Sequence, residues 1–365
     1  MVAVKFRLVG KSLLSYARSI LAVSAVVLMA TAGQARGAHT LVVSQTRING
    51  FAQDGKFIAW TAGAHHGFPC GTGVTIRNLE TGRQRRFALR PTPCFFGVVL
   101  GGRHALVGTP PTICGNCVGI TVWTASLGGH LAELETFAET PGDEGGHRLT
   151  GIAGDRRVLA LSWVNYSMVD DDCNPTCSWN ATAGRVKRVM DGAQVLVPGI
   201  PPAARLAVGA GRIATAPAPA SWQDQNIIRP AENGPVDIVD ADTGAPVASV
   251  SPAGTVEELA LSSHSLAVLL ERADGTHAIE RYAIPSGSML SSTPVGGAAQ
   301  DLDLAKKWIV YRVWRRIKLI DDGGDRHLLK ITPHRPFDVS IEGTRVAWAE
   351  NGGGRHRIRA VMVPN

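Results

Sequence analysis

Six cysteines are the residues of this chain whose type and spacing most clearly suggest a chemical role. All lie between residues 70 and 177: Cys70, Cys94, Cys114, Cys117, Cys173 and Cys177. An even number of cysteines is typical of disulfide bonds in an exported protein, because such proteins fold where thiols oxidise. Zinc is the alternative, since Cys114 and Cys117 have ligand-like spacing and His65 and His66 are available. We favour disulfides, because thiolate ligands compete poorly with oxidation in that compartment.

The segment around Cys173 also carries oxygen donors in the alternating pattern of a calcium loop: Asp170, Asp172, Asn174 and Thr176. The match is incomplete, because Pro175 replaces the glycine of such loops and Ala181 stands where a glutamate would close the ligand shell. We therefore predict a solvated acidic loop, and neither a metal ion nor another cofactor.

Sequence motifs of common catalytic centres are absent, including the nucleophile elbow, the zinc-protease motif and the phosphate-binding loop. The alternative function is a hydrolase or lyase whose acidic and histidine residues meet at the centre of the fold, as paired acids do in glycoside cleavage. The candidate residues for this chemistry are His39, His104, His147, His264, Glu257, Glu258, Asp301 and Asp303.

The first 35 residues predict export. Lys5, Arg7, Lys11 and Arg18 precede an apolar run over residues 20–32, and small residues follow it. The run is shorter than the roughly 20 residues of a membrane-spanning helix. We predict a cleaved signal peptide over residues 1–35, with an uncleaved amphipathic anchor as the alternative. The mature protein would then be secreted or periplasmic, without stable insertion in the membrane.

The positive charge of the chain belongs largely to this signal. The full sequence has a net charge of +7, whereas residues 36–365 hold 33 basic and 30 acidic residues, a net charge of +3. Basic clusters at 83–86, 312–318 and 355–359 fall in alternating, strand-like stretches and are read as solvated faces. The sequence therefore argues against a nucleic-acid partner.

After the signal, a turn followed by a short apolar strand occurs seven times. The intervals between these units range from 37 to 55 residues, and their average is 48. Repeats of this size, built from short strands without helical spacing, are typical of β-propeller blades. We predict an all-β fold over residues 38–365, a β-propeller of about seven four-stranded blades.

The strands of the first repeat are expected at 48–52, 56–61, 74–79 and 83–89. The last repeat ends after three strands, at 337–341, 345–350 and 357–363, whereas an extra strand at 40–46 precedes the first repeat. We predict that this N-terminal strand completes the last blade and closes the ring, which removes an exposed sheet edge.

Residues 52–62 and 317–329 resemble the repeat of TolB-type (WD40-like) propellers, in which an Asp-Gly-Lys turn opens a strand and a later strand ends in an Asp-rich turn with glycine. The resemblance covers the propeller as architecture and is specific in repeats one, six and seven. The amino-terminal α/β domain of TolB is missing. The resemblance implies a propeller fold, a periplasmic or secreted location and a binding role.

Long connections gather on one face of the predicted propeller, at 62–73, 110–118, 165–180 and 217–234. With this register the cysteines lie on that face, and the simplest pairing is Cys70–Cys94, Cys114–Cys117 and Cys173–Cys177. Long loops often carry function, although the disulfides can also serve only to stabilise them. We predict a monomeric, non-catalytic scaffold that binds a protein or glycan partner through exposed residues of these loops: His65, His66, Phe68, Tyr166, Trp179, Trp222, Gln223 and Asn226.

Overall fold

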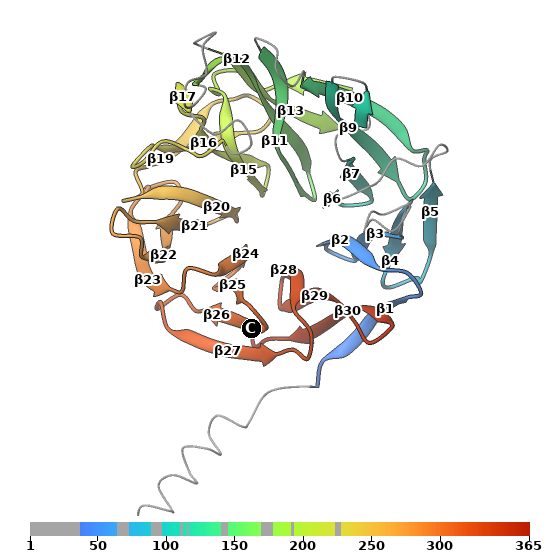
Figure 1. The fold of residues 1–365 in the computed structure, drawn as a ribbon. Helices are drawn as coiled ribbons and strands as arrows, with labels where there is room; N and C mark the ends of the chain where they lie inside the picture. Colours follow the sequence, from blue (N-terminus) through green and yellow to red (C-terminus); the bar gives the residue numbers. More distant parts are fainter. Residues whose placement is uncertain are drawn as a thin grey trace, which may run out of the picture. The chain divides into compact units, whose positions relative to one another are not determined.

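The computed structural model describes residues 37–63, 73–88, 97–109, 112–114, 117–139, 145–168, 178–190, 193–222 and 228–365. The unit His39–Asn365 is a ring of seven β-sheet blades around a central axis, two of which share one continuous sheet (Figure 1). No helix occurs in the described residues, so none of them forms a helix able to cross a membrane. The predicted all-β, seven-bladed propeller is confirmed.

Each blade contains four antiparallel strands, which are listed here from the axis outward. The blades are numbered in chain order of their inner strands. Blade 1 consists of β2 (Ile48–Asp54), β3 (Phe57–Ala62), β4 (Gly73–Asn78) and β5 (Gln84–Ala88). Blade 4 consists of β15 (Ala203–Gly209), β16 (Arg212–Pro217), β18 (Val236–Asp240) and β19 (Pro246–Val250). Blade 5 consists of β20 (Thr255–Leu261), β21 (Ser265–Glu271), β22 (His277–Ala283) and β23 (Met289–Val295). Blade 6 consists of β24 (Ala299–Ala305), β25 (Trp308–Val313), β26 (Arg316–Ile320) and β27 (Arg326–Ile331).

Blades 2 and 3 form one continuous sheet, because Glu139 lies opposite Gly146 where the two blades meet. Blade 2 consists of β6 (Gly97–Gly101), β7 (His104–Gly108), β9 (Cys117–Ser126) and β10 (Ala132–Glu139), with the short β8 (Thr112–Cys114) paired to β9. Blade 3 consists of β11 (Gly145–Asp155), β12 (Val158–Met168), β13 (Trp179–Met190) and β14 (Ala193–Leu196), with β17 (Ser221–Trp222) paired to β13.

The N-terminal strand closes the ring, as predicted. Blade 7 consists of β28 (Pro336–Glu342), β29 (Arg345–Gly352), β30 (Arg355–Met362) and β1 (His39–Ser44), so its outermost strand comes from the other end of the chain. In the register, His39 lies opposite Ala360 and Ser44 lies opposite His356. Val42 of β1 is buried and belongs to the core between blades 7 and 1.

Turn geometry explains why the repeats are recognisable in the sequence. Gly55 follows the inner strand of blade 1 with a φ of 55°, a left-handed conformation that glycine adopts without steric cost. Ala210 and Lys306 occupy the corresponding turns of blades 4 and 6 with a φ of 53° each. These tight turns bring the apolar second strands, such as β3 and β25, into the middle of each sheet, where four consecutive residues are buried.

The hydrophobic core lies between adjacent blades rather than around the axis. Apolar side chains of blades 4 and 5 form one such cluster, and those of blades 5 and 6 form another. The outer strands are far less buried, and all four residues of β14 are exposed. Polar residues at the ends of the inner strands therefore line the axis.

Candidate functional site

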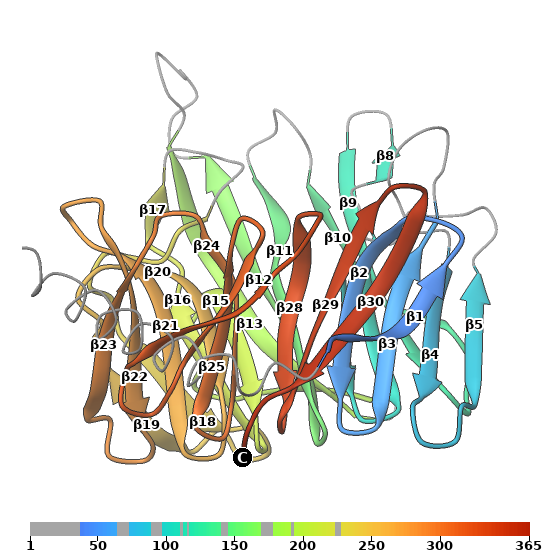
Figure 2. The same ribbon diagram turned by 90° about the horizontal axis from the view of Figure 1, so that it is seen from below.

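Blades 2 and 3 extend beyond the other blades on one side of the ring. Strands β9, β11, β12 and β13 contain 10 to 12 residues, whereas strands of the separate four-stranded sheets contain 5 to 8. Figure 2 shows their upper ends rising above the ring, together with β8. We call this surface the extended rim: β8, β17, and the ends of β9, β11, β12 and β13 on the same side. It is the side on which the sequence predicts the long connections.

The rim links neighbouring blades through their backbones. After β16 the chain of blade 4 returns to blade 3, where Trp222 and Ser221 of β17 lie opposite Trp179 and Asn180 of β13. In blade 2, the hairpin β8–β9 places Cys114 opposite Cys117. This backbone position is compatible with the short pairing predicted for these two cysteines. The other four cysteines lie outside the described residues.

Three of the predicted binding residues are buried rather than exposed. Tyr166, Trp179 and Trp222 are 8%, 3% and 9% exposed. The Tyr166 ring meets the rings of Trp179 and Trp222 edge-on, with centroid distances of 5.3 and 6.0 Å. The expectation that these aromatic side chains are exposed is wrong, because the pairing of β13 with β17 covers them with one another. Their position points to a structural role in which they hold the rim together.

His65, His66, Phe68, Gln223 and Asn226 lie outside the described residues, as do the proposed calcium ligands. On the described part of the rim, the accessible polar groups are different ones. Nδ1 of the exposed His147 donates a 2.7 Å hydrogen bond to Oδ1 of Asn165, and Ser221 is exposed on β17.

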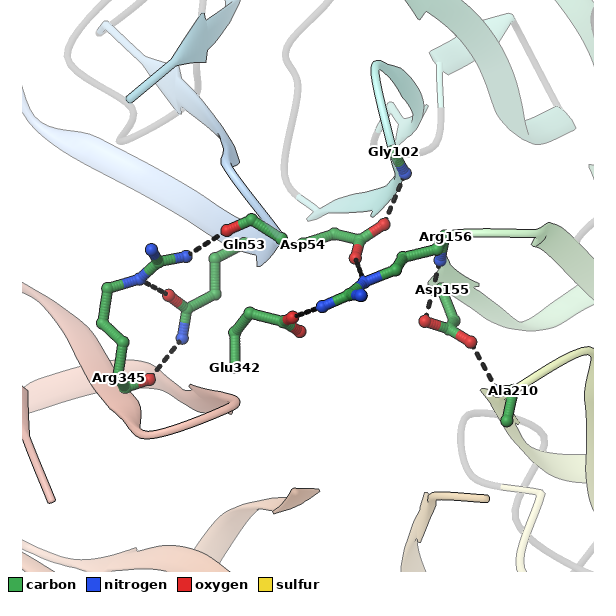
Figure 3. A network of polar contacts seen from close by, with 9 residues as sticks. Gln53, Asp54, Gly102, Asp155, Arg156, Ala210, Glu342 and Arg345 are labelled. Carbon is green, nitrogen blue, oxygen red and sulfur yellow. Dashed lines mark hydrogen bonds and ion pairs between the residues drawn. The ribbon is translucent and has the colours of Figure 1, made fainter. Parts of the chain in front are cut away.

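The central channel opens on the opposite side of the ring into a cavity of about 570 Å³ that is lined by both acidic and basic side chains. Inner strands and their following turns supply the lining, including Asp54, Asp155, Arg156, Asp303 and Glu342. Arg156 of blade 3 lies between two carboxylates from other blades (Figure 3). Its Nε is 3.5 Å from Oδ1 of Asp54 in blade 1, and its Nη2 donates to Oε1 of Glu342 in blade 7.

This network was not found from the sequence. In the sequence, Asp54 and Glu342 stand out only as residues before a turn glycine. Arg156 contacts both, although it lies 186 residues before Glu342 in the chain. Arg345 adds a second link between blades 7 and 1, because its Nε donates to Oε1 of Gln53 at 2.8 Å and its Nη2 donates to the Gly55 carbonyl at 2.7 Å.

Inner-strand carboxylates of blades 1, 3, 5, 6 and 7 accept backbone N–H groups of the blade that follows. Oδ2 of Asp303 accepts from Ile341 at 2.8 Å, and Oδ1 accepts from Leu304 at 2.8 Å. Asp301 accepts from Val339 at 3.2 Å and from Nε of Arg312. These contacts occupy the two acids considered for catalysis. They favour a structural role for Asp301 and Asp303 over a catalytic pair.

Burial raises the pKa values of two carboxyl groups in this cavity, those of Asp303 and Asp54. It raises the pKa of Asp303 to about 6, against the opposing N–H groups of Ile341 and Leu304. Burial also raises the pKa of Asp54 to about 6; the Gly102 N–H opposes the rise, and Glu342 adds to it. Carboxyl groups with such values can exchange protons near neutral pH, but here their oxygens face backbone donors and Arg156.

The candidate histidines do not gather at the axis. His39 is exposed on the outermost strand of blade 7, His104 begins the second strand of blade 2, and His264 lies in the first turn of blade 5. His147 lies on the rim. The expectation that these four residues share the channel is wrong, because the strand register distributes them over four blades.

Within the described residues, one group of three possible metal ligands comes together. Glu257, Glu271 and His277 lie in blade 5, with ligand atoms within 4.8 Å of one another. Nε2 of His277 is 3.4 Å from Oε1 of Glu257, and Nη1 of Arg229 is 3.6 Å from Oε2 of Glu271. The neighbouring guanidinium already compensates one carboxylate and disfavours a bound cation.

Fold and site together define this chain as a seven-bladed β-propeller. No family model and no curated protein matches the sequence. The solved structures it resembles include a catalytically inactive virginiamycin B lyase from Staphylococcus aureus with quinupristin, at 12% identity and a TM-score of 0.50, covering 90% of this chain and 99% of that chain. They also include BamB from Moraxella catarrhalis, at 12% identity and a TM-score of 0.43, covering 87% and 84% of the two chains. At these identities the likeness concerns the fold alone.

Proposed function

We propose that this chain is an exported, non-catalytic β-propeller of the TolB-like type that binds a protein or glycan partner through the extended rim. The observation that carries the proposal is the length of β9, β11, β12 and β13, which exceeds the length of the strands in the separate four-stranded sheets. The opposite side of the ring is made of short turns such as Gly55–Lys56. A surface that projects from a rigid ring is well placed for recognition.

The buried aromatic cluster supports this interpretation in an indirect way. Tyr166, Trp179 and Trp222 fix the rim in one arrangement, so that less conformational freedom is lost when a partner binds. The groups that contact the partner are then expected among the exposed polar residues around this cluster, such as His147 and Ser221.

The test uses a matched pair of substitutions after a partner has been captured from an envelope extract or on a glycan array. Ser221→Lys places a charged, longer side chain on the exposed surface of β17, whereas Ser288→Lys makes the same change at an exposed turn on the opposite side of the ring. Disruption of an interface centre typically costs about 2 kcal/mol or more. We expect Ser221→Lys to weaken binding at least about tenfold in surface plasmon resonance, and Ser288→Lys to leave it unchanged.

Two other outcomes would contradict the proposal. Equal affinity of both variants would place the contact away from the rim. Loss of binding on Asp303→Asn, together with turnover of the captured molecule, would favour the enzyme alternative.

Export and disulfide formation are tested on the protein from the native cell. A cleaved signal predicts an N-terminus close to residue 36 in the secreted or periplasmic fraction. Mass spectrometry of unreduced peptides should link Cys70 to Cys94, Cys114 to Cys117 and Cys173 to Cys177. An intact N-terminus or stoichiometric free thiols would contradict this part of the proposal.

A further inference from the structure

A second cavity lies on the same side of the ring as the rim, between blades 6, 7 and 1. Its volume is about 420 Å³, within the range of small-molecule sites. The beginnings of β2 and β28 and the ends of β25 and β29 surround it. Its described lining contains three arginines, Arg47, Arg312 and Arg335, and no carboxylate. Asn49, Phe337 and Asn351 also line it.

Arg312 provides a buried cation in the wall of this cavity. Its side chain is 8% exposed, Nε donates to Oδ2 of Asp301, and Nη2 donates to Oε1 of Gln300. Nη1 has no hydrogen-bond partner among the described residues and is shielded from solvent. A buried donor without a partner on a charged group is costly. A small shift of the wall that opens Nη1 to the cavity would let a ligand oxygen satisfy it.

Arg47 and Arg335 add charge that nearby acids do not neutralise. Asp301 compensates Arg312, whereas Arg335 lies over the Trp314 ring at 5.4 Å and touches Oε1 of Gln300 only at 3.4 Å. Both Arg47 and Arg335 are exposed, and neither forms an ion pair with an acid of the described residues. Two positive charges therefore remain at the opening. Guanidinium groups bind carboxylates and phosphates through paired hydrogen bonds.

The cavity is held in shape by contacts between blades 7 and 1. Nδ2 of Asn351 donates to the Ile48 carbonyl at 2.7 Å, and its Oδ1 accepts from the Ile48 N–H at 3.1 Å. Asn49 is fixed in a similar way, because its Nδ2 donates to the Gly63 carbonyl at 3.1 Å. The half-buried ring of Phe337 supplies an apolar surface beside these polar groups. A fixed wall of this kind loses little freedom when a ligand binds.

We infer that this cavity binds a small organic anion, a carboxylate or a phosphate ester, with its oxygens at the arginines and its apolar part against Phe337. The site is independent of the rim, because no rim residue lines it. Binding here and binding of a partner at the rim can therefore fail separately.

The first experiment measures binding of three probes to the full propeller by isothermal titration calorimetry at low salt. Phenyl phosphate and benzoate carry the two anionic groups on the same ring, and benzamide is the neutral control. We expect at least one anion to bind at least about tenfold more tightly than benzamide, since hydrogen bonds to charged groups are the stronger ones. The tighter of the two anions identifies the group that the site prefers. Equal binding of all three probes, or no binding of either anion, would overturn the inference.

The second experiment uses exposed arginines, so that folding is preserved and the buried pair of Arg312 with Asp301 stays intact. The double variant Arg47→Gln/Arg335→Gln should lose at least about tenfold in affinity for the preferred anion. Arg83→Gln changes the net charge at an exposed turn on the opposite side and should leave the affinity unchanged. Equal loss in Arg83→Gln would indicate attraction by net charge alone, and an unchanged double variant would place the anion elsewhere; either result overturns the inference.

Discussion

Acidic side chains near the axis of this propeller act as joints between blades. Six of them accept a backbone N–H from the next blade, from its inner strand or the turn after it: Asp54, Asp155, Glu258, Asp301, Asp303 and Asp338. A hydrogen bond to a charged acceptor is worth more than a neutral one. The burial of these carboxylates opposes that gain, and the balance depends on pH.

Asp338 is the clearest case, and it gives a prediction for stability. Burial raises its pKa to about 7, and Asp301 adds to the rise, whereas the Phe51 N–H and Arg312 act against it. A carboxyl group whose pKa is raised by folding contributes stability below its unfolded pKa, and that contribution is lost as the pH rises through the folded pKa. Between about pH 4 and pH 7, this residue therefore makes the folded state less stable as the pH rises.

We predict that Asp338→Asn removes this dependence. Asparagine keeps an oxygen for the Phe51 N–H and carries no charge, so the variant should gain stability relative to the wild type at pH 7.5 but not at pH 4.5. The expected change in the difference is on the order of 1–3 kcal/mol, since one pKa unit corresponds to about 1.4 kcal/mol. Urea unfolding at both pH values measures it. A difference that is the same at the two values would show that the carboxyl titrates normally.

At the scale of elements, the rim is built from strands of two blades rather than from separate loops. β17 leaves blade 4 and pairs with β13 of blade 3, and the indole rings of Trp179 and Trp222 are covered where the two strands meet. The apolar cluster around them also contains Val164 and Ile228. The rim is therefore an extension of the core between blades 3 and 4.

This arrangement predicts a loss of stability when the cluster is truncated. Trp179→Ala should lower the free energy of unfolding by about 3–5 kcal/mol, the typical cost of replacing a buried aromatic side chain by alanine. Tyr166→Phe removes only a hydroxyl group and serves as the control, with a much smaller loss. Denaturant unfolding followed by circular dichroism distinguishes them. An unfolding curve of Trp179→Ala identical to that of the wild type would mean that the side chain is exposed in solution.

At the scale of the whole molecule, the ring is closed by residues from opposite ends of the sequence. β1 pairs with β30, and Asn351 and Arg345 attach blade 7 to blade 1. With the ring closed, every inner and middle strand of blade 7 is paired on the sides that face its neighbours in the sheet. The outer edges of the blades remain sheet edges. The propeller therefore depends on a strand of six residues that is separated from its partner by almost the full chain.

We predict that removal of residues 1–46 destabilises the entire propeller, whereas removal of residues 1–36 does not. The longer deletion exposes the core between blades 7 and 1, and the burial of Val42 alone is worth ~1.5–3 kcal/mol. Thermal unfolding of the two truncated proteins gives the comparison, and light scattering reports aggregation through the unpaired edge of β30. Equal melting temperatures would show that closure by β1 is dispensable.

The sequence by itself determined the propeller, the number of its blades and the strand that closes the ring. These features follow from local rules: strands alternate with a period of two, and turns require particular residues at short range, as at Gly55. The incomplete last repeat and the extra strand at residues 40–46 indicate ring closure from the residue pattern alone.

Only the tertiary structure decided what the side chains of the candidate sites do. Trp179 and Trp222 are buried because β17 of blade 4 pairs with β13 of blade 3, and Asp303 is occupied because the Ile341 N–H of the next blade donates to it. Arg312 comes near Arg47 because the closed ring brings the last two blades beside the first. Such encounters join residues far apart in the chain, and no local pattern encodes them, because they depend on how the blades are rotated and packed around a common axis.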